Sequence, residues 1–171
     1  YEYNDAGIRT KRTDKYYEEG KVSFSEEYER NDAGIVTKRT DKYYREGKVS
    51  SSKEYEYNDA EFITKKTYKD SEGKVTSTEE YEYNDDRIRI NKKTYKDTKG
   101  KVTSTEEYAY NDAGIRIKKT YKDSEGKVTS TEEYEYNDDG YLFKRINKDA
   151  DGKIIGSKEY EYNAGDLIKE I

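Results

Sequence analysis

The chain has 171 residues, 43% of them charged, and a formal net charge of -5. Because acidic and basic residues are interspersed, the charge argues against nucleic-acid binding. The sequence has no Cys, which excludes disulfides and thiolate metal sites. No apolar run reaches the roughly 18 residues that a membrane helix needs. Branched aliphatic residues are few, but 21 tyrosines supply large amphipathic side chains that favour strands.

Internal repeats organise the whole sequence. An Asn that begins a turn of the NDAG type recurs every 26 or 27 residues, at Asn4, Asn31, Asn58, Asn84, Asn111, Asn137 and Asn163. A second turn, which ends in Gly-Lys, lies between each pair of these turns, with its glycine at Gly20, Gly47, Gly73, Gly100, Gly126 and Gly152. Each repeat therefore contains two strands and two turns.

The domain organisation follows from this period. We expect tandem hairpin repeats over residues 1–163, with units that start at Asn4, Asn31, Asn58, Asn84, Asn111 and Asn137. The divergent end, residues 164–171, is expected to form a C-terminal capping strand.

The predicted fold is all-β. Tandem antiparallel β-hairpins of this kind would form an extended twisted sheet, ribbon or spiral of about 14 strands. No helix is expected, because no segment keeps a 3.6-residue apolar period and the stretches rich in Lys and Glu alternate with period two.

The register can be predicted from the repeat that starts at Asn111. With four-residue turns, Tyr110 would lie opposite Ile115 and Glu107 opposite Lys118. One face would then be semi-apolar, with tyrosines and isoleucines around a polar patch. Arg116 would lie on the opposite, solvated face together with Lys118.

Three repeats are one residue longer before their second turn. Asn91 in IRINKKTYK has no counterpart in IRIKKTYK, and the stretches IRTKRTDKYY and IVTKRTDKYY carry the same excess. We expect β-bulges or a longer turn at these places.

The turn sequences resemble those of a known family. The recurrent Tyr-x-Tyr-Asn-Asp-x-Gly, as in YEYNDAG and YAYNDAG, followed by an alternating strand and a Gly turn, is similar to the YD repeats of the RHS family. In that family the corresponding stretch reads Tyr-x-Tyr-Asp-x-x-Gly, and the unit is shorter than the one found here. The resemblance covers essentially the whole chain. It implies a hairpin strip within a hollow shell or an extended structure on a bacterial surface.

The residues that most often carry catalysis are absent or repeated. The chain has no His and no Cys, so the commonest general base and the thiol nucleophile are missing. Paired glutamates, as at Glu79 and Glu80, recur in equivalent positions and would face Lys or Arg. We therefore expect no enzymatic activity, no catalytic residues and no cofactor.

Some turns resemble parts of calcium loops. The sequences NDDG and DADG combine clustered carboxylates with a glycine, which suits calcium. The same residues are those that tight turns select, and no bidentate Glu follows at the required spacing. Turn chemistry is the favoured interpretation, and no metal site is expected.

The candidate functional residues are tyrosines that recur on one face of the sheet: Tyr55, Tyr57, Tyr81, Tyr83, Tyr108, Tyr110, Tyr134 and Tyr136. Such a face can stack on sugars or on a protein partner. The rings can equally cover the aliphatic side chains and close a thin core. Both interpretations stay open at this point.

The sequence as a whole predicts a non-enzymatic structural or interaction scaffold, part of a bacterial surface stalk, fibre or shell. The alternative is a module that binds carbohydrate or cell wall through the tyrosine-lined face. The expected location is extracellular or on the cell surface, with any signal or anchor outside this chain. Expected partners are further copies, joined through sheet edges, or carbohydrate. Neither nucleic acid nor membrane insertion is expected.

Overall fold

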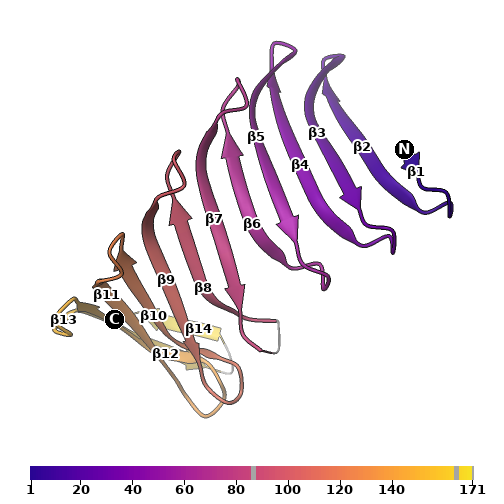
Figure 1. Ribbon diagram of the computed structural model, residues 1–171. Helices are drawn as coiled ribbons and strands as arrows, with labels where there is room; N and C mark the ends of the chain where they lie inside the picture. Colours follow the sequence, from indigo (N-terminus) through magenta and orange to yellow (C-terminus); the bar gives the residue numbers. More distant parts are fainter. Residues whose placement is uncertain (86–87, 164–165, 171) are drawn as a thin grey trace. The chain divides into compact units, whose positions relative to one another are not determined.

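A computed structural model describes residues 1–85, 88–163 and 166–170 (Figure 1). Fourteen strands follow one another in the sheet in chain order, from β1 to β14. The two terminal strands are not neighbours in this order, so the sheet is open. The prediction of an all-β fold with about 14 antiparallel strands is confirmed. In the described part of the chain no helix could cross a membrane.

The chain divides into two compact units, residues 1–89 with 94–102 and residues 90–93 with 103–171. The first unit contains β1 (Glu2–Tyr3), β2 (Arg9–Glu18), β3 (Lys21–Arg30), β4 (Val36–Arg45), β5 (Lys48–Tyr57), β6 (Ile63–Lys69) and β7 (Val75–Tyr83). The second contains β10 (Arg116–Asp123), β11 (Val128–Tyr136), β12 (Leu142–Asp149), β13 (Ile154–Asn163) and β14 (Asp166–Glu170). Residues of both units contribute to β8 (Ile90–Lys96) and β9 (Val102–Tyr110).

The turns at Asn4, Asn31, Asn58, Asn111 and Asn137 have three residues rather than four. In the turn at Asn111, the Gly114 N–H donates to the Asn111 carbonyl at 2.8 Å, and the Asn111 N–H donates to the Ile115 carbonyl at 2.9 Å. Gly114 has a φ of 76°, in the left-handed region. This is a type I turn followed by a left-handed residue, a common hairpin loop. The Asn111 side chain adds a further bond, since its Oδ1 accepts the Ile115 N–H at 2.9 Å.

The predicted register is therefore wrong. Asn111 pairs with Ile115, which moves the register by one residue relative to the four-residue turn. A β-bulge between Arg116 and Lys118 then moves it again, so that Lys118 lies opposite Ala109 and not opposite a glutamate. The Asn side chain and the left-handed glycine make the shorter loop stable, and counting side-chain pairs could not detect this.

The bulge also changes a predicted face assignment. Arg116 was expected on the solvated face, but its guanidinium carbon lies 4.9 Å from the centroid of the Tyr134 ring. Ile117, expected beside the tyrosines, is 38% exposed. The predicted face of Lys118, which follows the bulge, is correct, because Lys118 lies on the same face as Glu133, 3.8 Å away.

The two IxTKRTDKYY repeats use a shorter second turn. Glu19 and Gly20 have φ values of 47° and 79°, which is typical of a two-residue type I′ turn. The extra residue of these repeats therefore lengthens the strands, and the expected longer turn is wrong here. The expected bulge is found between Tyr16 and Tyr17. A similar bulge in a shorter repeat, between Tyr68 and Lys69, shows that the bulge does not absorb the extra residue.

In the repeat that contains Asn91 the extra residue lies in the Asn turn. The Asn84 N–H donates to the Arg89 carbonyl at 2.9 Å, which makes this turn one residue longer than the others. A longer turn is thus found, but at the Asn turn and not at Asn91, where it was expected; residues 86–87 lie outside the described residues.

The expected capping segment contains β14, which pairs with Tyr160–Asn163 of β13. Residues 164, 165 and 171 of this segment lie outside the described residues. A capping role for the segment stays a prediction.

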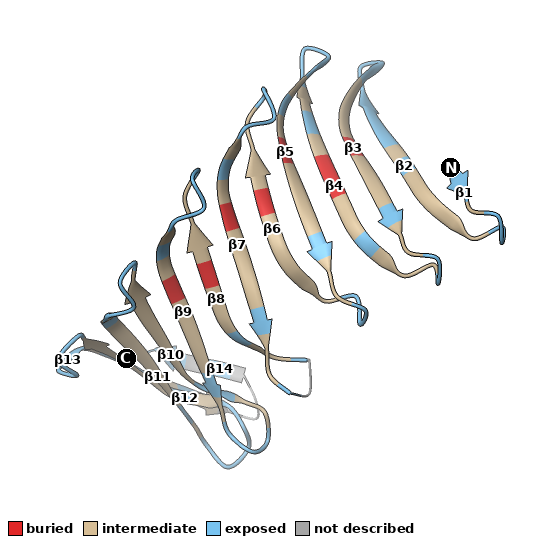
Figure 2. Ribbon diagram, viewed as in Figure 1, coloured by how far each residue is buried: buried red, intermediate tan, exposed pale blue. Residues whose placement is uncertain are grey.

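No apolar side chain is buried among the described residues. The least exposed side chains are short and polar and lie near the middle of the strands (Figure 2): Ser25, Thr40, Asp41, Ser52, Thr67, Thr78, Thr94 and Thr105. Thr67 lies directly opposite Thr78. Because Lys and Glu side chains have long apolar stems, those on adjacent strands cover such short residues.

Candidate functional site: the tyrosine face

In each unit, one face of the sheet carries the candidate tyrosines, and we call it the tyrosine face. In the first unit it includes Tyr55 and Tyr57 of β5 and Tyr81 and Tyr83 of β7. In the second unit it includes Tyr108 and Tyr110 of β9 and Tyr134 and Tyr136 of β11. Two tyrosines separated by one residue point to the same side of a strand. All eight side chains are half-buried.

Cations lie over the rings in the first unit. The Lys66 ammonium is 5.9 Å from the centroid of the Tyr55 ring and 5.2 Å from that of Tyr81. Arg39 lies 4.8 Å from the Tyr55 centroid. These are cation–π distances, so each cation holds a ring and shields part of its surface.

The second unit repeats this arrangement. Arg116 lies between the Tyr108 and Tyr134 rings, at 5.8 Å and 4.9 Å from their centroids. The Lys119 ammonium is 4.2 Å from the centroid of the Tyr121 ring and 3.1 Å from the carboxylate of Glu106. Tyrosine, cation and glutamate therefore form a continuous polar network on this face.

Glutamates hold pairs of tyrosine hydroxyls. The Glu132 carboxylate accepts the Tyr121 hydroxyl at 2.8 Å and the Tyr134 hydroxyl at 2.5 Å. Burial would raise the pKa of Glu132, but the hydrogen bonds from the two tyrosines outweigh it and lower that pKa. Burial, and then the bond to the carboxylate, raise the pKa of Tyr134. In the first unit, Glu79 accepts the hydroxyls of Tyr68 and Tyr81 in the same way.

The second tyrosine of three of these strands donates to the preceding strand. Tyr83 donates to the Ile63 carbonyl at 2.7 Å, and Tyr136 donates to the Arg116 carbonyl at 2.9 Å. Tyr110 makes the equivalent bond to Ile90 at 2.7 Å. These bonds lie next to the Asn turns and fix the tyrosines before any ligand binds.

An arginine and an aspartate replace the Tyr–Glu contacts in the second repeat. Arg39 donates two hydrogen bonds to Asp41, each 2.6 Å long. Asp41 is only 2% exposed, and this bidentate bond raises the pKa of Arg39. This pair is not among the residues predicted to be functional. The Arg-Thr-Asp sequence contained the signal, because residues two apart share one face of a strand.

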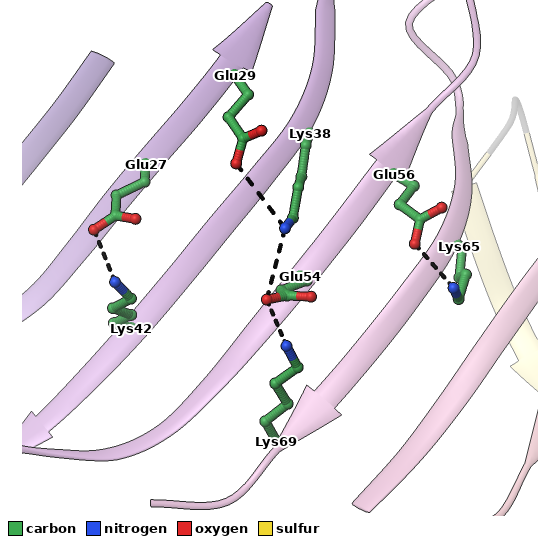
Figure 3. Close-up of polar contacts among 8 residues, drawn as sticks. All are labelled: Glu27, Glu29, Lys38, Lys42, Glu54, Glu56, Lys65 and Lys69. Atoms are coloured by element: carbon green, nitrogen blue, oxygen red, sulfur yellow. Dashed lines mark hydrogen bonds and ion pairs between the residues drawn. The ribbon is translucent and has the colours of Figure 1, made fainter. Parts of the chain in front are cut away.

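The opposite face carries lysines and glutamates (Figure 3). In the first unit Lys38 lies 3.9 Å from Glu29 and 3.8 Å from Glu54, and Lys69 lies 2.6 Å from Glu54. The contacts Lys42–Glu27 and Lys65–Glu56 extend this pattern at 2.8 Å and 2.9 Å. The pairs are partly exposed, so each contributes no more than about 1 kcal/mol.

The aspartate turns use their carboxylates internally. Asp149 Oδ1 accepts the N–H groups of Asp151 and Lys153 at 3.1 Å and 2.9 Å. This is the turn chemistry favoured from the sequence. Across the described ranges no group of three or more acidic residues is placed to hold a metal ion.

No protein-family model and no curated protein matches this chain. Three solved structures show partial likeness. The crystal structure of TcdB2-TccC3-TEV is 13% identical with a TM-score of 0.41, over 88% of this chain and 9% of that one. A porin-like protein from Bacteroides uniformis is 20% identical with a TM-score of 0.47, over 84% of this chain and 55% of that one. A protein of unknown function from Bacteroides fragilis is 15% identical with a TM-score of 0.14, over 98% of this chain and 94% of that one. These scores are too low to carry an argument about function.

The Asp41 pair predicts a difference between two equivalent substitutions. Asp41→Asn should lower the free energy of unfolding by about 2 kcal/mol, because Arg39 loses a charged, buried acceptor. Asp14→Asn removes the same contact, 2.6 Å long, between Arg12 and Asp14, where the side chains are 40% and 21% exposed. Its cost should be clearly smaller, because water screens this more exposed pair. Urea unfolding followed by circular dichroism measures both, and equal losses would contradict the role of burial.

The tyrosine face predicts loss of stability in alkali. Burial raises the pKa of Tyr55 to about 12, from an ordinary value of 10.0. Between these values the folded protein keeps a proton that the unfolded chain has released, so the stabilisation is complete below pH 10 and is lost as the pH rises toward 12. Urea unfolding at stepped pH should show this fall, and Tyr55→Phe should reduce it. Tyr17→Phe, at a tyrosine that is 63% exposed, is the control and should leave the slope unchanged.

Proposed function

We propose that this chain is a non-enzymatic structural scaffold, a β-hairpin repeat array within a bacterial surface stalk, fibre or shell. The observation that carries the proposal is that equivalent polar side chains bond to one another in successive repeats. Glu79 in one unit and Glu132 in the other each hold two tyrosine hydroxyls. Repetition of one bonding pattern along a sheet is typical of a scaffold.

Catalysis would require a different arrangement. An active site brings together groups whose environments separate their pKa values, at one place in the molecule. Here Glu79 and Glu132 occur in equivalent surroundings, and the nearby phenols are their partners. This supports a role in holding strands together.

The geometry also bears on the two interpretations of the tyrosines. A ring that stacks on a sugar must offer an open surface, but Lys66 and Arg116 each lie over two of the candidate rings. Most of the candidate hydroxyls donate to groups within the sheet. This favours a structural role for the middle of the face over ligand stacking there.

The surface location is supported by the resemblance of the turn sequences to YD repeats. Association of copies through sheet edges belongs to the same proposal. Because β1 pairs only with the start of β2, the outer edge of β2 offers backbone groups to a further strand.

Deletion of one repeat tests the scaffold. Removal of residues 31–57 takes away one whole repeat and joins Arg30 to Asn58, which is equivalent to Asn31. The shortened chain should therefore keep its β-sheet circular dichroism and a cooperative urea transition. The dependence of the unfolding free energy on urea should fall, because less surface is exposed on unfolding.

Removal of half a repeat is the matched control. Deletion of residues 31–45 takes away β4 with its preceding turn, so β3 and β5 both lose the strand with which they pair, and the urea transition should become less cooperative. A whole-repeat deletion that fails to fold would contradict a modular scaffold.

Antibody labelling tests the surface location. Antibodies against the purified chain should label intact cells of the organism that encodes it, and permeabilisation should add little signal. An antibody against a cytosolic protein is the control for cell integrity. Signal that appears only after the cells are opened would contradict the proposed location.

A further inference from the structure

An open groove lies between two successive Asn turns of the first unit. It encloses about 460 Å³ and is lined in part by Asn58, Asp59, Tyr81, Asn84 and Asp85. Tyr83 completes its aromatic side. The volume falls within the range of small-molecule sites. The groove lies at the ends of the strands, and of its two tyrosines only Tyr81 also takes part in a Tyr–Glu contact.

The groove offers hydrogen-bonding groups of both kinds. The carboxylates of Asp59 and Asp85 are exposed and make no hydrogen bond or ion pair with other described residues. The Asn58 Oδ1 accepts the Phe62 N–H at 2.9 Å, which orients the side-chain amide and leaves its nitrogen as a donor. Asn84 is oriented in the same way by the Arg89 N–H at 3.0 Å.

The two aromatic rings are fixed in advance. The Tyr81 hydroxyl donates to Glu79, and the Tyr83 hydroxyl donates to the Ile63 carbonyl at 2.7 Å. The Tyr83 ring also packs against Phe62, with centroids 5.4 Å apart. Side chains that are already ordered lose little entropy when a ligand binds.

We infer that this groove binds a neutral oligosaccharide. Sugar hydroxyls can donate to the two carboxylates and accept from the two amides, while the C–H face of a pyranose packs on the Tyr83 ring. A cationic ligand is less suited, because the Lys66 ammonium already lies 5.2 Å from the Tyr81 centroid. The site goes beyond the proposed scaffold, and its stacking ring is Tyr83, at the end of the tyrosine face.

A groove between two Asn turns of the first repeat shares only one lining position with this one. It lies between the turns at Asn4 and Asn31, and Arg30 occupies the position of Tyr83. The Arg30 Nη1 donates to the Gly34 carbonyl at 2.8 Å. The fold therefore accepts arginine at the position of Tyr83. The Tyr83→Arg variant should fold but lack the aromatic surface of the groove.

Isothermal titration calorimetry with cellohexaose, maltohexaose and N-acetylchitohexaose tests the inference. We expect at least one of them to bind the full chain at ligand concentrations up to about 5 mM, the range of weak single sites. Asp59→Asn combined with Asp85→Asn should weaken this binding by about tenfold or more, the loss expected for roughly one net hydrogen bond. Tyr83→Arg should weaken it as well.

The control is Glu72→Gln combined with Glu125→Gln. Like the double Asn variant, it removes two negative charges, but at two exposed turns that end in Gly-Lys. It should leave binding unchanged. Circular dichroism confirms folding of each variant. Failure of all three sugars to bind, equal binding by the double Asn variant, or binding of octalysine in place of the sugars would overturn the inference. None of these outcomes affects the repeat-deletion or cell-labelling tests, so the two proposals fail separately.

Discussion

Cross-strand pairing is the interaction on which this structure depends. No apolar side chain is buried among the described residues, so a conventional core cannot offset the conformational entropy that strands lose on folding. Stability must come from the backbone ladder together with many side-chain pairs, each worth roughly 0.2 to 1 kcal/mol. Such small contributions suffice only when they recur, and this gives the repeated sequence a physical reason. Within one strand, the bidentate contact between Arg39 and the buried Asp41 adds to these cross-strand pairs.

The two faces use charge in different ways. On the lysine and glutamate face, partly exposed ion pairs such as Lys69–Glu54 link neighbouring strands and shelter short Thr and Ser residues. On the tyrosine face, carboxylates are shared by phenols, and cations lie over the rings. Most functional groups on both faces thus bond within the sheet. The groove beside the Asn58 turn differs because its two aspartates are not used in this way.

Particular residues show how far the sequence could be interpreted. The period of the Asn turns predicted the number and direction of the strands, and the Tyr-x-Tyr alternation placed pairs such as Tyr81 and Tyr83 on one side of a strand. The position of Arg116 could not be predicted, because a bulge next to the turn reverses the alternation on which such assignments depend. The groove was also missed, because its residues come from two turns that are about 26 positions apart.

The sequence by itself determined the all-β class and the hairpin order, because these follow from local turn chemistry and the two-residue period of a strand. Only the tertiary structure decided the register, the partners of each tyrosine and the groove between adjacent turns. The physical reason is that one hydrogen bond from an Asn side chain, or one bulged residue, shifts every later pair along the strand.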